Sequence, residues 1–462
     1  MAAQINARTL KGFRDHLPAD MAPRREMLRV VERVFEVHGF APLDTPALEY
    51  AEVLAGKYGE EGDKLLYRFA DHGGRDVALR YDLTVPLARV VAQHGGALAM
   101  PLRRYHIASV WRADKPQRGR FREFMQCDVD IAGSASAMAD AEVLITGMAA
   151  VRALGVTEFT LHLNHRDLLR ALLAAADVRE EGAQLAALRA IDKWDKVGEA
   201  GVRRELSTIA GLDEAGIDEL MSGFALAGVG AASADDHAAL NADLMSRLRA
   251  SLGELACLDR LAEVLALVDA AGLAGHLRID PTIARGLDYY TGVIFETRLT
   301  DARVAGMGAV MSGGRYDGLI GMFGKQAVPA VGISLGLDRL LAALRELGLA
   351  AGGEGAAAVY VTVFDRERQS ASVAMASSLR AAGLTVELDT EGGKLAKQFK
   401  RADRRGNRFV VVIGDHEAAA GVAVLKALDS GAQQTLATAD VAAAITASLG
   451  HGDLGEQGRR RI

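Results

Sequence analysis

The chain has 462 residues, of which 50% are hydrophobic and 25% are charged, and its formal net charge is −6. This length exceeds one compact core, so we expect two or three domains of an ordinary globular protein, and no apolar run approaches the ~20 residues of a membrane helix. The acidic balance argues against a dedicated DNA-binding protein. Cys127 and Cys257 form neither a metal-ligand spacing nor a disulfide framework, so we expect a reducing, cytoplasmic location.

The first third of the chain changes from a helical to a strand-like pattern. Residues 22–37 repeat apolar and charged side chains at helical spacing, which predicts an amphipathic helix that ends at Gly39. Beyond residue 65, alternation with period two predicts antiparallel strands, with two helices among them. We expect strands at 66–70, 77–81, 104–110, 122–131 and 159–164, and helices at 82–93 and 137–154.

Strand patterns then disappear between about residues 167 and 273, which indicates a helical insertion. Strands are expected again at 276–280, 293–299 and 304–311, followed by a helix at 337–347. A glycine-rich stretch at 350–356 indicates a linker, and beyond it strands alternate with helices, which predicts a small α/β domain with a parallel sheet. Its strands are expected at 359–364, 385–388 and 409–413, and its helices at 366–382 and 394–405.

A strand, loop and strand at residues 103–130 carries polar side chains where a packed sheet would be apolar. Alternation places Gln126, Asp128 and Asp130 on one face of the second strand. Together with Arg112, that face could bind an anion at one end and a cationic or amine group at the other. The alternative is an exposed hairpin with solvated charges, which polar residues at period two make less favourable.

Two glycine-rich segments could approach a ligand closely. In segment 284–292, Arg285 precedes a glycine, and Tyr289 and Tyr290 offer hydroxyls and flat apolar faces. The alternative is a turn whose tyrosines pack on a core. Segment 312–318 has vicinal glycines that permit approach to a flat ligand such as a purine, or that simply form a hairpin.

Charged residues at three helices have two interpretations each. Arg339 begins a helix, where a positive charge is unfavourable unless an anion lies nearby; it could also be a surface arginine. Asp82, with Thr84 beside it, could hold an amine or cap a helix. A basic stripe could contact an RNA backbone or lie on a solvated face. The stripe consists of Lys394, Lys397, Lys400, Arg401, Arg404 and Arg405.

In combination these segments resemble the class II aminoacyl-tRNA synthetases, and among them the histidyl-tRNA synthetase family. Residues 112–130 resemble motif 2 of that class, and residues 332–339 resemble motif 3. Segments 285–290 and 312–318 resemble the two segments peculiar to the histidine family, and 11–18 resembles its N-terminal entry. Tyr81-Asp-Leu-Thr84 departs from the Pro-Glu-Gly-Thr of many bacterial members, and aspartate shortens the reach toward an amine.

The resemblance implies an α+β fold. It comprises an antiparallel six-stranded catalytic sheet with flanking helices, a helical insertion and a C-terminal α/β anticodon-binding domain. The implied parts are a catalytic domain in two pieces (1–166 and 276–349), the insertion (167–275), the linker (350–356), the anticodon-binding domain (357–450) and a flexible tail (451–462). A homodimer is also implied.

The implied activity has two steps. Histidine and ATP, bound with Mg²⁺ as a substrate complex, give histidyl-adenylate and pyrophosphate, and the histidyl group then passes to the 3′ end of tRNA(His). Neither a protein-held metal nor a prosthetic group is expected, and DNA and membranes are not expected partners. The resemblance assigns catalysis to Arg285 and Arg112. It assigns ATP binding to Arg112, Asp114, Arg120, Phe124 and Arg339. Histidine binding is assigned to Asp82, Thr84, Gln126, Asp130, Arg285, Tyr289 and Tyr290. tRNA binding is assigned to Gln117, Arg118, Lys397, Lys400, Arg401 and Arg404.

Two alternatives stay open. One is a regulatory subunit of ATP phosphoribosyltransferase, a non-charging relative that looks like the catalytic domain alone. The presence of Arg112, Arg285 and Arg339, with a further domain after the linker, argues against it. The other is a synthetase of the same subgroup for threonine, proline or glycine, against which segment 285–290 speaks.

Overall fold

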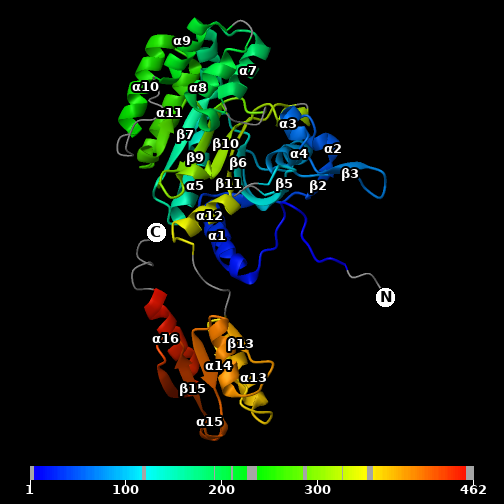
Figure 1. Ribbon diagram of the computed structural model, residues 1–462, viewed down its shortest axis with the longest axis vertical. Helices are drawn as coiled ribbons and strands as arrows, with labels where there is room; N and C mark the ends of the chain where they lie inside the picture. Colours follow the sequence, from blue (N-terminus) through cyan, green and yellow to red (C-terminus); the bar gives the residue numbers. More distant parts are fainter. Residues whose placement is uncertain are drawn as a thin grey trace. The chain divides into compact units, whose positions relative to one another are not determined.

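The computed structural model describes residues 5–116, 121–191, 193–209, 212–225, 237–284, 289–324, 326–350 and 357–453. The chain divides into two compact units (Figure 1). The larger unit contains residues 1–15 and 27–350, and the smaller contains residues 16–26 and 351–462. Helix α1 (Pro18–Val37) contributes to both. Among the described residues, no helix is both long and apolar enough to cross a membrane.

An eight-stranded sheet forms the centre of the larger unit. In spatial order its strands are β1 (Ala41–Pro42), β5 (Leu102–Trp111), β6 (Glu123–Ala132), β11 (Ala330–Gly336), β10 (Met311–Arg315), β9 (Val293–Leu299), β7 (Phe159–His165) and β8 (Leu277–Ile279). The six inner strands are antiparallel, which confirms the predicted α+β class and its antiparallel sheet. The two short edge strands pair in parallel and raise the strand count above the predicted six.

Two strand predictions in this sheet were wrong. The strand expected at 304–311 is largely a 3-10 turn, Ala305–Met307, ended by Gly308 at φ 75°. The strand in this region, β10, contains the vicinal glycines instead of preceding them. Strand β11 was not predicted, although its apolar residues Val331, Ile333 and Leu335 alternate with small residues.

One face of the sheet is apolar and the other is polar. Cys127, Val129 and Ile131 belong to the main hydrophobic core, which includes helix α5 (Ala137–Ala153). Gly147 of α5 permits a close approach, since a β-carbon there would lie 2.9 Å from Ile333. The opposite face carries Gln126 and its alternate neighbours and is where the candidate site lies.

A smaller layer of strands and helices shares a second apolar cluster with residues of the large sheet. The layer contains a three-stranded sheet of β2 (Leu48–Tyr50), β4 (Asp76–Leu79) and β3 (Arg68–Ala70), together with α2 (Ala51–Leu54), α3 (Gly59–Asp63) and α4 (Thr84–His94). Its core includes Tyr58, Tyr81 and Leu87 with Tyr289 and Tyr316. Strand β2 was not predicted, because three residues are too few to show alternation.

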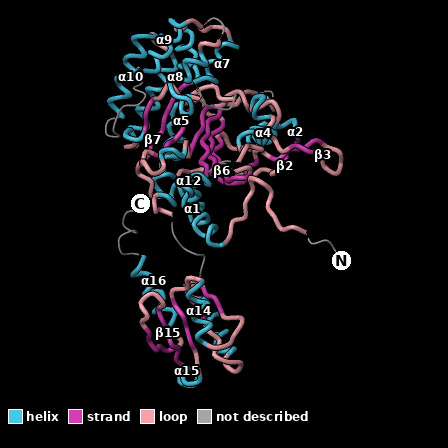
Figure 2. Tube along the Cα trace, viewed as in Figure 1, coloured by secondary structure: helices cyan, strands magenta, loops and turns pink. Residues whose placement is uncertain are grey.

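The predicted helical insertion is present between β7 and β8. Figure 2 shows helices and no strands in its described part. These helices are α6 (Arg166–Ala175), α7 (Glu181–Ile191), α8 (Trp194–Leu206), α9 (Glu214–Ala225), α10 (His237–Leu252) and α11 (Ala256–Ala270). Helix α11 packs against α5, so the insertion is joined to the apolar side of the large sheet.

The smaller unit has a mixed five-stranded sheet, where a parallel one was predicted. Its order is β13 (Val386–Leu388), β12 (Val359–Val361), β14 (Phe409–Val412), β15 (Val422–Ala427) and β16 (Gln433–Ala437). The first three strands are parallel, as predicted, and β15 and β16 add an antiparallel hairpin that had not been recognised. The helices are α13 (Gln369–Ala381), α14 (Leu395–Arg404), α15 (Asp415–Ala420) and α16 (Val441–Asp453).

Candidate active site

The polar face of the large sheet is buried. Gln126, Asp128 and Asp130 are 7%, 2% and 2% exposed, so the alternative of an exposed hairpin is wrong. Their register partners on β11 are Gly336, Ser334 and Gly332, respectively. Small residues on this neighbouring strand leave room above the sheet for polar side chains.

Asp130 is held by one cation and one hydroxyl. Nη2 of Arg104, a residue only 1% exposed, lies 2.8 Å from Asp130 Oδ2, and Tyr316 donates its hydroxyl to Oδ1. A β-carbon at position 332 would overlap Asp130 Oδ1, so glycine is required there. Burial raises the pKa of Asp130, and Arg104 opposes that shift.

The contacts of Asp82 agree with the helix-capping interpretation, and the amine-binding interpretation stays a prediction. Its Oδ1 accepts a 3.0 Å hydrogen bond from the Val85 amide, as a helix-capping aspartate does, and a 3.1 Å bond from Tyr58. Its Oδ2 accepts the Tyr289 hydroxyl at 3.2 Å, which brings segment 289–290 to the start of α4. Burial raises the pKa of Asp82, while these donors and Arg112 lower it.

Of the two predicted tyrosines, Tyr289 packs on an apolar core, and a ligand contact of either tyrosine stays a prediction. Tyr289 is 6% exposed and belongs to the second apolar cluster, yet its hydroxyl reaches Asp82 and Thr84. Tyr290 packs edge-to-face against Tyr289 and hydrogen-bonds with its hydroxyl. A β-carbon at Gly314 would lie 2.9 Å from Tyr290 Cδ1, so this glycine lets the ring lie close to the sheet.

Arg112 lies at the end of the same hairpin. Its guanidinium lies 4.3 Å from the ring centroid of Tyr81 and 5.1 Å from that of Phe124, and Nε donates to Tyr81 O at 3.1 Å. The guanidinium charge of Arg112 lies near Asp82 and lowers the pKa of that carboxyl. Asp114 is buried, and its carbonyl accepts Arg122 Nε at 2.9 Å.

The start of α12 (Leu337–Glu346) lies against this hairpin and the N-terminal segment. Asp338 accepts the Met125 amide at 2.9 Å and forms an ion pair with Arg14. Arg339 donates to the Ala309 carbonyl. Arg14 and Asp338 were missed, and the adjacency of Asp338 to the predicted Arg339 was the available signal.

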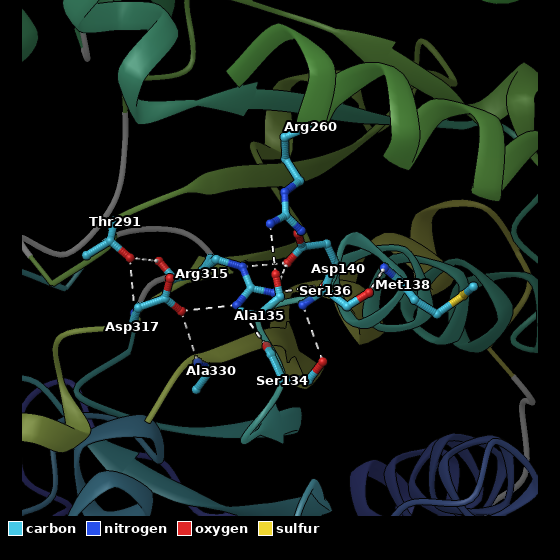
Figure 3. Close-up of polar contacts among 10 residues, drawn as sticks. All are labelled: Ser134, Ala135, Ser136, Met138, Asp140, Arg260, Thr291, Arg315, Asp317 and Ala330. Atoms are coloured by element: carbon cyan, nitrogen blue, oxygen red, sulfur yellow. Dashed lines mark hydrogen bonds and ion pairs between the residues drawn. The ribbon is translucent and has the colours of Figure 1, made fainter. Parts of the chain in front are cut away.

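A buried network of ion pairs holds Arg315, which lies beside Thr291 of segment 289–292 (Figure 3). Arg315, at the end of β10, donates to Asp140 from Nε at 2.9 Å and Nη2 at 2.6 Å, and Nη1 reaches Asp317 at 3.1 Å. Arg260 of α11 donates to the other Asp140 oxygen at 3.2 Å. The Arg315 carbonyl accepts the Thr291 amide at 2.8 Å. Sequence reasoning noted only the glycines beside Arg315 and gave no role to Asp140 or Arg260.

Several predicted site residues lie outside the described residues: Arg285, Gln117, Arg118 and Arg120. In the smaller unit, Lys397, Lys400 and Arg404 are exposed on α14. Arg401, from the same stripe, instead pairs with buried Asp389 and with Glu391 at 2.9 Å. Among the described residues, no group of three or more histidine, cysteine or acidic side chains could hold a metal ion.

Comparisons with known proteins agree on one family. A family model described as histidyl-tRNA synthetase matches residues 12–340, and a model described as anticodon binding domain matches residues 358–448. A histidine–tRNA ligase from Rhodopirellula baltica is 43% identical over 435 residues, which cover 94% of this chain and 96% of that protein. One from Wolinella succinogenes is 41% identical and covers 96% of this chain and 98% of that protein. The crystal structure of a histidyl-tRNA synthetase from a Nostoc species has a TM-score of 0.83 at 33% identity, covering 96% of this chain and 100% of that one.

Proposed function

We propose that this chain, which belongs to the histidyl-tRNA synthetase family, is a histidine–tRNA ligase that forms histidyl-adenylate and then charges tRNA(His). The observation that carries the proposal is the buried polar cluster on the sheet face. It brings Asp82, Gln126, Asp130 and Tyr290 onto neighbouring elements, with Arg112 close to Asp82. Such a cluster provides both hydrogen-bond acceptors and donors for a small amino acid that carries an amine and an imidazole.

In the first step, a carboxylate oxygen of histidine attacks the α-phosphorus of ATP. The new oxygen–phosphorus bond gives the adenylate, and the bond to pyrophosphate breaks. Negative charge grows on the phosphate oxygens, and fixed cations offset it. Arg112 and Arg339 supply these cations, and Arg285 is expected to act beside the reacting carboxylate. Mg²⁺ enters with ATP and shares the phosphate charge; Asp114, Phe124 and Arg120 are expected to line the nucleotide.

Histidine recognition follows from the polar cluster. Asp82 and Thr84 face the α-amino group, Gln126 orients the amino acid, and Asp130, Tyr289 and Tyr290 lie on the imidazole side. An apolar amino acid would leave these buried groups without partners, which costs far more than a lost methylene contact. The site therefore discriminates without a separate editing step.

In the second step, a hydroxyl of the tRNA 3′-terminal ribose attacks the histidyl carbonyl carbon, and AMP leaves. Gln117 and Arg118 of the motif 2 loop are expected to meet the acceptor end. Exposed Lys397, Lys400 and Arg404 are suited to an RNA backbone, whereas the acidic partners of Arg401 make it a positioning residue of α14. We also infer a cytoplasmic homodimer.

The regulatory-subunit alternative is less supported. Such chains resemble the catalytic domain alone, whereas the anticodon-binding model matches residues 358–448 here. Relatives named histidine–tRNA ligase also align over nearly the whole chain.

The test is exchange of labelled pyrophosphate into ATP by the purified chain, with each of the twenty amino acids in turn. Histidine alone should drive exchange, and tRNA(His) should then accept labelled histidine. Exchange driven by threonine, proline or glycine would show that this amino acid, and not histidine, is the substrate. No exchange with any amino acid would favour the regulatory alternative.

A further inference from the structure

Residues 11–14 near the start of the chain contact both ends of the loop between β5 and β6. The Gly12 carbonyl accepts the Arg122 amide at 2.9 Å, and Arg122 Nε donates to the Asp114 carbonyl on the other side of the loop at 2.9 Å. A β-carbon at Gly12 would lie 2.8 Å from Arg122 Cδ and 3.0 Å from Pro116 Cγ, and the φ of 88° also favours glycine. Gly12 therefore lies between the two ends of the loop and in contact with both.

Arg14 connects this loop to the start of α12. Its guanidinium lies 3.6 Å from the ring centroid of Phe121, at the end of the loop, and forms an ion pair with Asp338 in the first turn of α12. The other carboxyl oxygen of Asp338 accepts the Met125 amide of β6 at 2.9 Å. The buried carboxylate of Asp338 thus joins the N-terminal segment, β6 and α12 at one point.

The joined elements carry two of the cations that the proposed function assigns to ATP. The Arg112 amide donates to the Arg122 carbonyl at 2.9 Å, beside the end of the loop that Gly12 contacts. Arg339 directly follows Asp338 in α12. Because Arg112 lies on the hairpin and Arg339 on the helix, the separation of their guanidinium groups depends on how α12 packs against the hairpin. The contacts of Arg14 hold that packing next to Arg339.

The simpler explanation of Arg14 is a surface ion pair, which would contribute little. Its side chain is 33% exposed, but that of Asp338 is only 5% exposed, and the aromatic face of Phe121 restricts the guanidinium further. The charge of Asp338 also matters for a nucleotide. A carboxylate one residue from Arg339 repels phosphate and competes for that arginine unless another cation neutralises it. Arg14 supplies this cation.

We propose that Arg14 is a positioning residue of the ATP site. It holds Asp338, and through it the first turn of α12, against the hairpin that carries Arg112. It also neutralises the carboxylate beside Arg339. The inference rests on the proposed function and deepens it, because it gives the N-terminal segment a role in binding the nucleotide. Arg14 acts through the two ATP arginines, and no bond forms or breaks at its own side chain.

The first test is Arg14→Met in the full chain, measured by pyrophosphate exchange. A displacement of about 1 Å can cost about a hundredfold in rate, and the backbone contacts of Gly12 and Met125 remain, so kcat/KM for ATP should fall about tenfold. The KM for ATP should rise, and the KM for histidine at saturating ATP should not change. A variant that was merely less stable would lower kcat and leave both KM values unchanged.

The matched control is Arg247→Met on α10, which removes an exposed ion pair with Asp243 in the same unit. It should leave kcat and both KM values unchanged, because an exposed pair of this kind contributes little.

Two further variants test the connection through Asp338. Arg14→Lys keeps the charge but loses the planar group that lies on Phe121, so it should recover part of the lost affinity for ATP, and it serves if Arg14→Met does not fold. Asp338→Asn keeps an acceptor for the Met125 amide and removes the charge that Arg14 neutralises. The double variant, Arg14→Met with Asp338→Asn, should have a KM for ATP no higher than that of Arg14→Met, because both changes remove the same contact.

The outcomes separate the two claims. If the unaltered protein shows no exchange with any amino acid, the proposed function fails. Calorimetric binding of ATP with Mg²⁺ does not depend on exchange, and its Kd should rise about tenfold in Arg14→Met. If histidine drives exchange but Arg14→Met leaves the KM and the Kd for ATP unchanged, or if the losses from Arg14→Met and Asp338→Asn add in the double variant, the inference about Arg14 is overturned and the proposed function stands.

Discussion

Asp140 should control both the stability of the larger unit and the affinity for histidine. Asp140→Asn leaves the guanidinium of Arg315, which is 4% exposed, without its principal anion. Breaking a buried ion pair costs about 3–5 kcal/mol, and we expect about 3 kcal/mol because Asp317 and two backbone carbonyls still contact Arg315. Arg260→Met removes a weaker contact from a side chain that is 28% exposed and should cost about 1 kcal/mol.

The assay is urea unfolding followed by circular dichroism, with histidine KM measured in parallel. The control is Arg249→Met, whose acidic partners Glu254 and Asp259 are largely exposed and whose loss should cost about 0.5 kcal/mol. Because Arg315 supports Thr291 just after the two tyrosines, Asp140→Asn should raise the KM for histidine more than that for ATP. An Asp140→Asn protein as stable as Arg249→Met would refute the reasoning.

Three further predictions concern other parts of the structure. Gly332→Ala should displace Asp130, raise the KM for histidine and destabilise the protein by about 1–3 kcal/mol in urea unfolding; an unchanged KM would show that the Asp130 position does not matter. Arg401→Met should lower the thermal midpoint of the smaller unit by removing a partner of buried Asp389, whereas Lys397→Met should weaken tRNA charging without changing that midpoint; the reverse assignment would contradict the α14 interpretation. Burial lowers the pKa of His106 to about 4, so the folded protein binds fewer protons than the unfolded chain between about pH 4 and 6.5 and should lose stability as pH falls through that window. His106→Gln should lose less stability between pH 6.5 and 4.5, and equal losses would exclude His106 as the cause.

Local patterns predicted most of the central sheet and much of the site. The alternation in residues 122–131 placed Gln126, Asp128 and Asp130 on one face, because side-chain direction in a strand depends only on local periodicity. The ionic partners of those residues were not predictable in the same way. Arg104 comes from β5 and Tyr316 from the segment after β10, and their meeting at Asp130 depends on strand order.

The same limit explains the missed support network. Asp140 lies 120 residues before Arg260 and 175 before Arg315 in sequence, and Arg260 reaches it only when α11 packs beside α5. Strand β10 was misplaced because two glycines normally weaken a strand. In this fold Gly313 and Gly314 are required by close neighbours, since β-carbons there would approach Phe295 Cε2 at 2.7 Å and Tyr290 Cδ1 at 2.9 Å.

The central claim is that histidine binds on the polar face of the large sheet. The most direct measurement is a crystal structure of the full chain grown with histidine and a non-hydrolysable ATP analogue. The account predicts the α-amino group within hydrogen-bonding distance of Asp82 or Thr84, the imidazole beside Asp130 and Tyr290, and the α-phosphate near Arg112. Histidine bound at any other surface, with this cluster unchanged, would contradict the account.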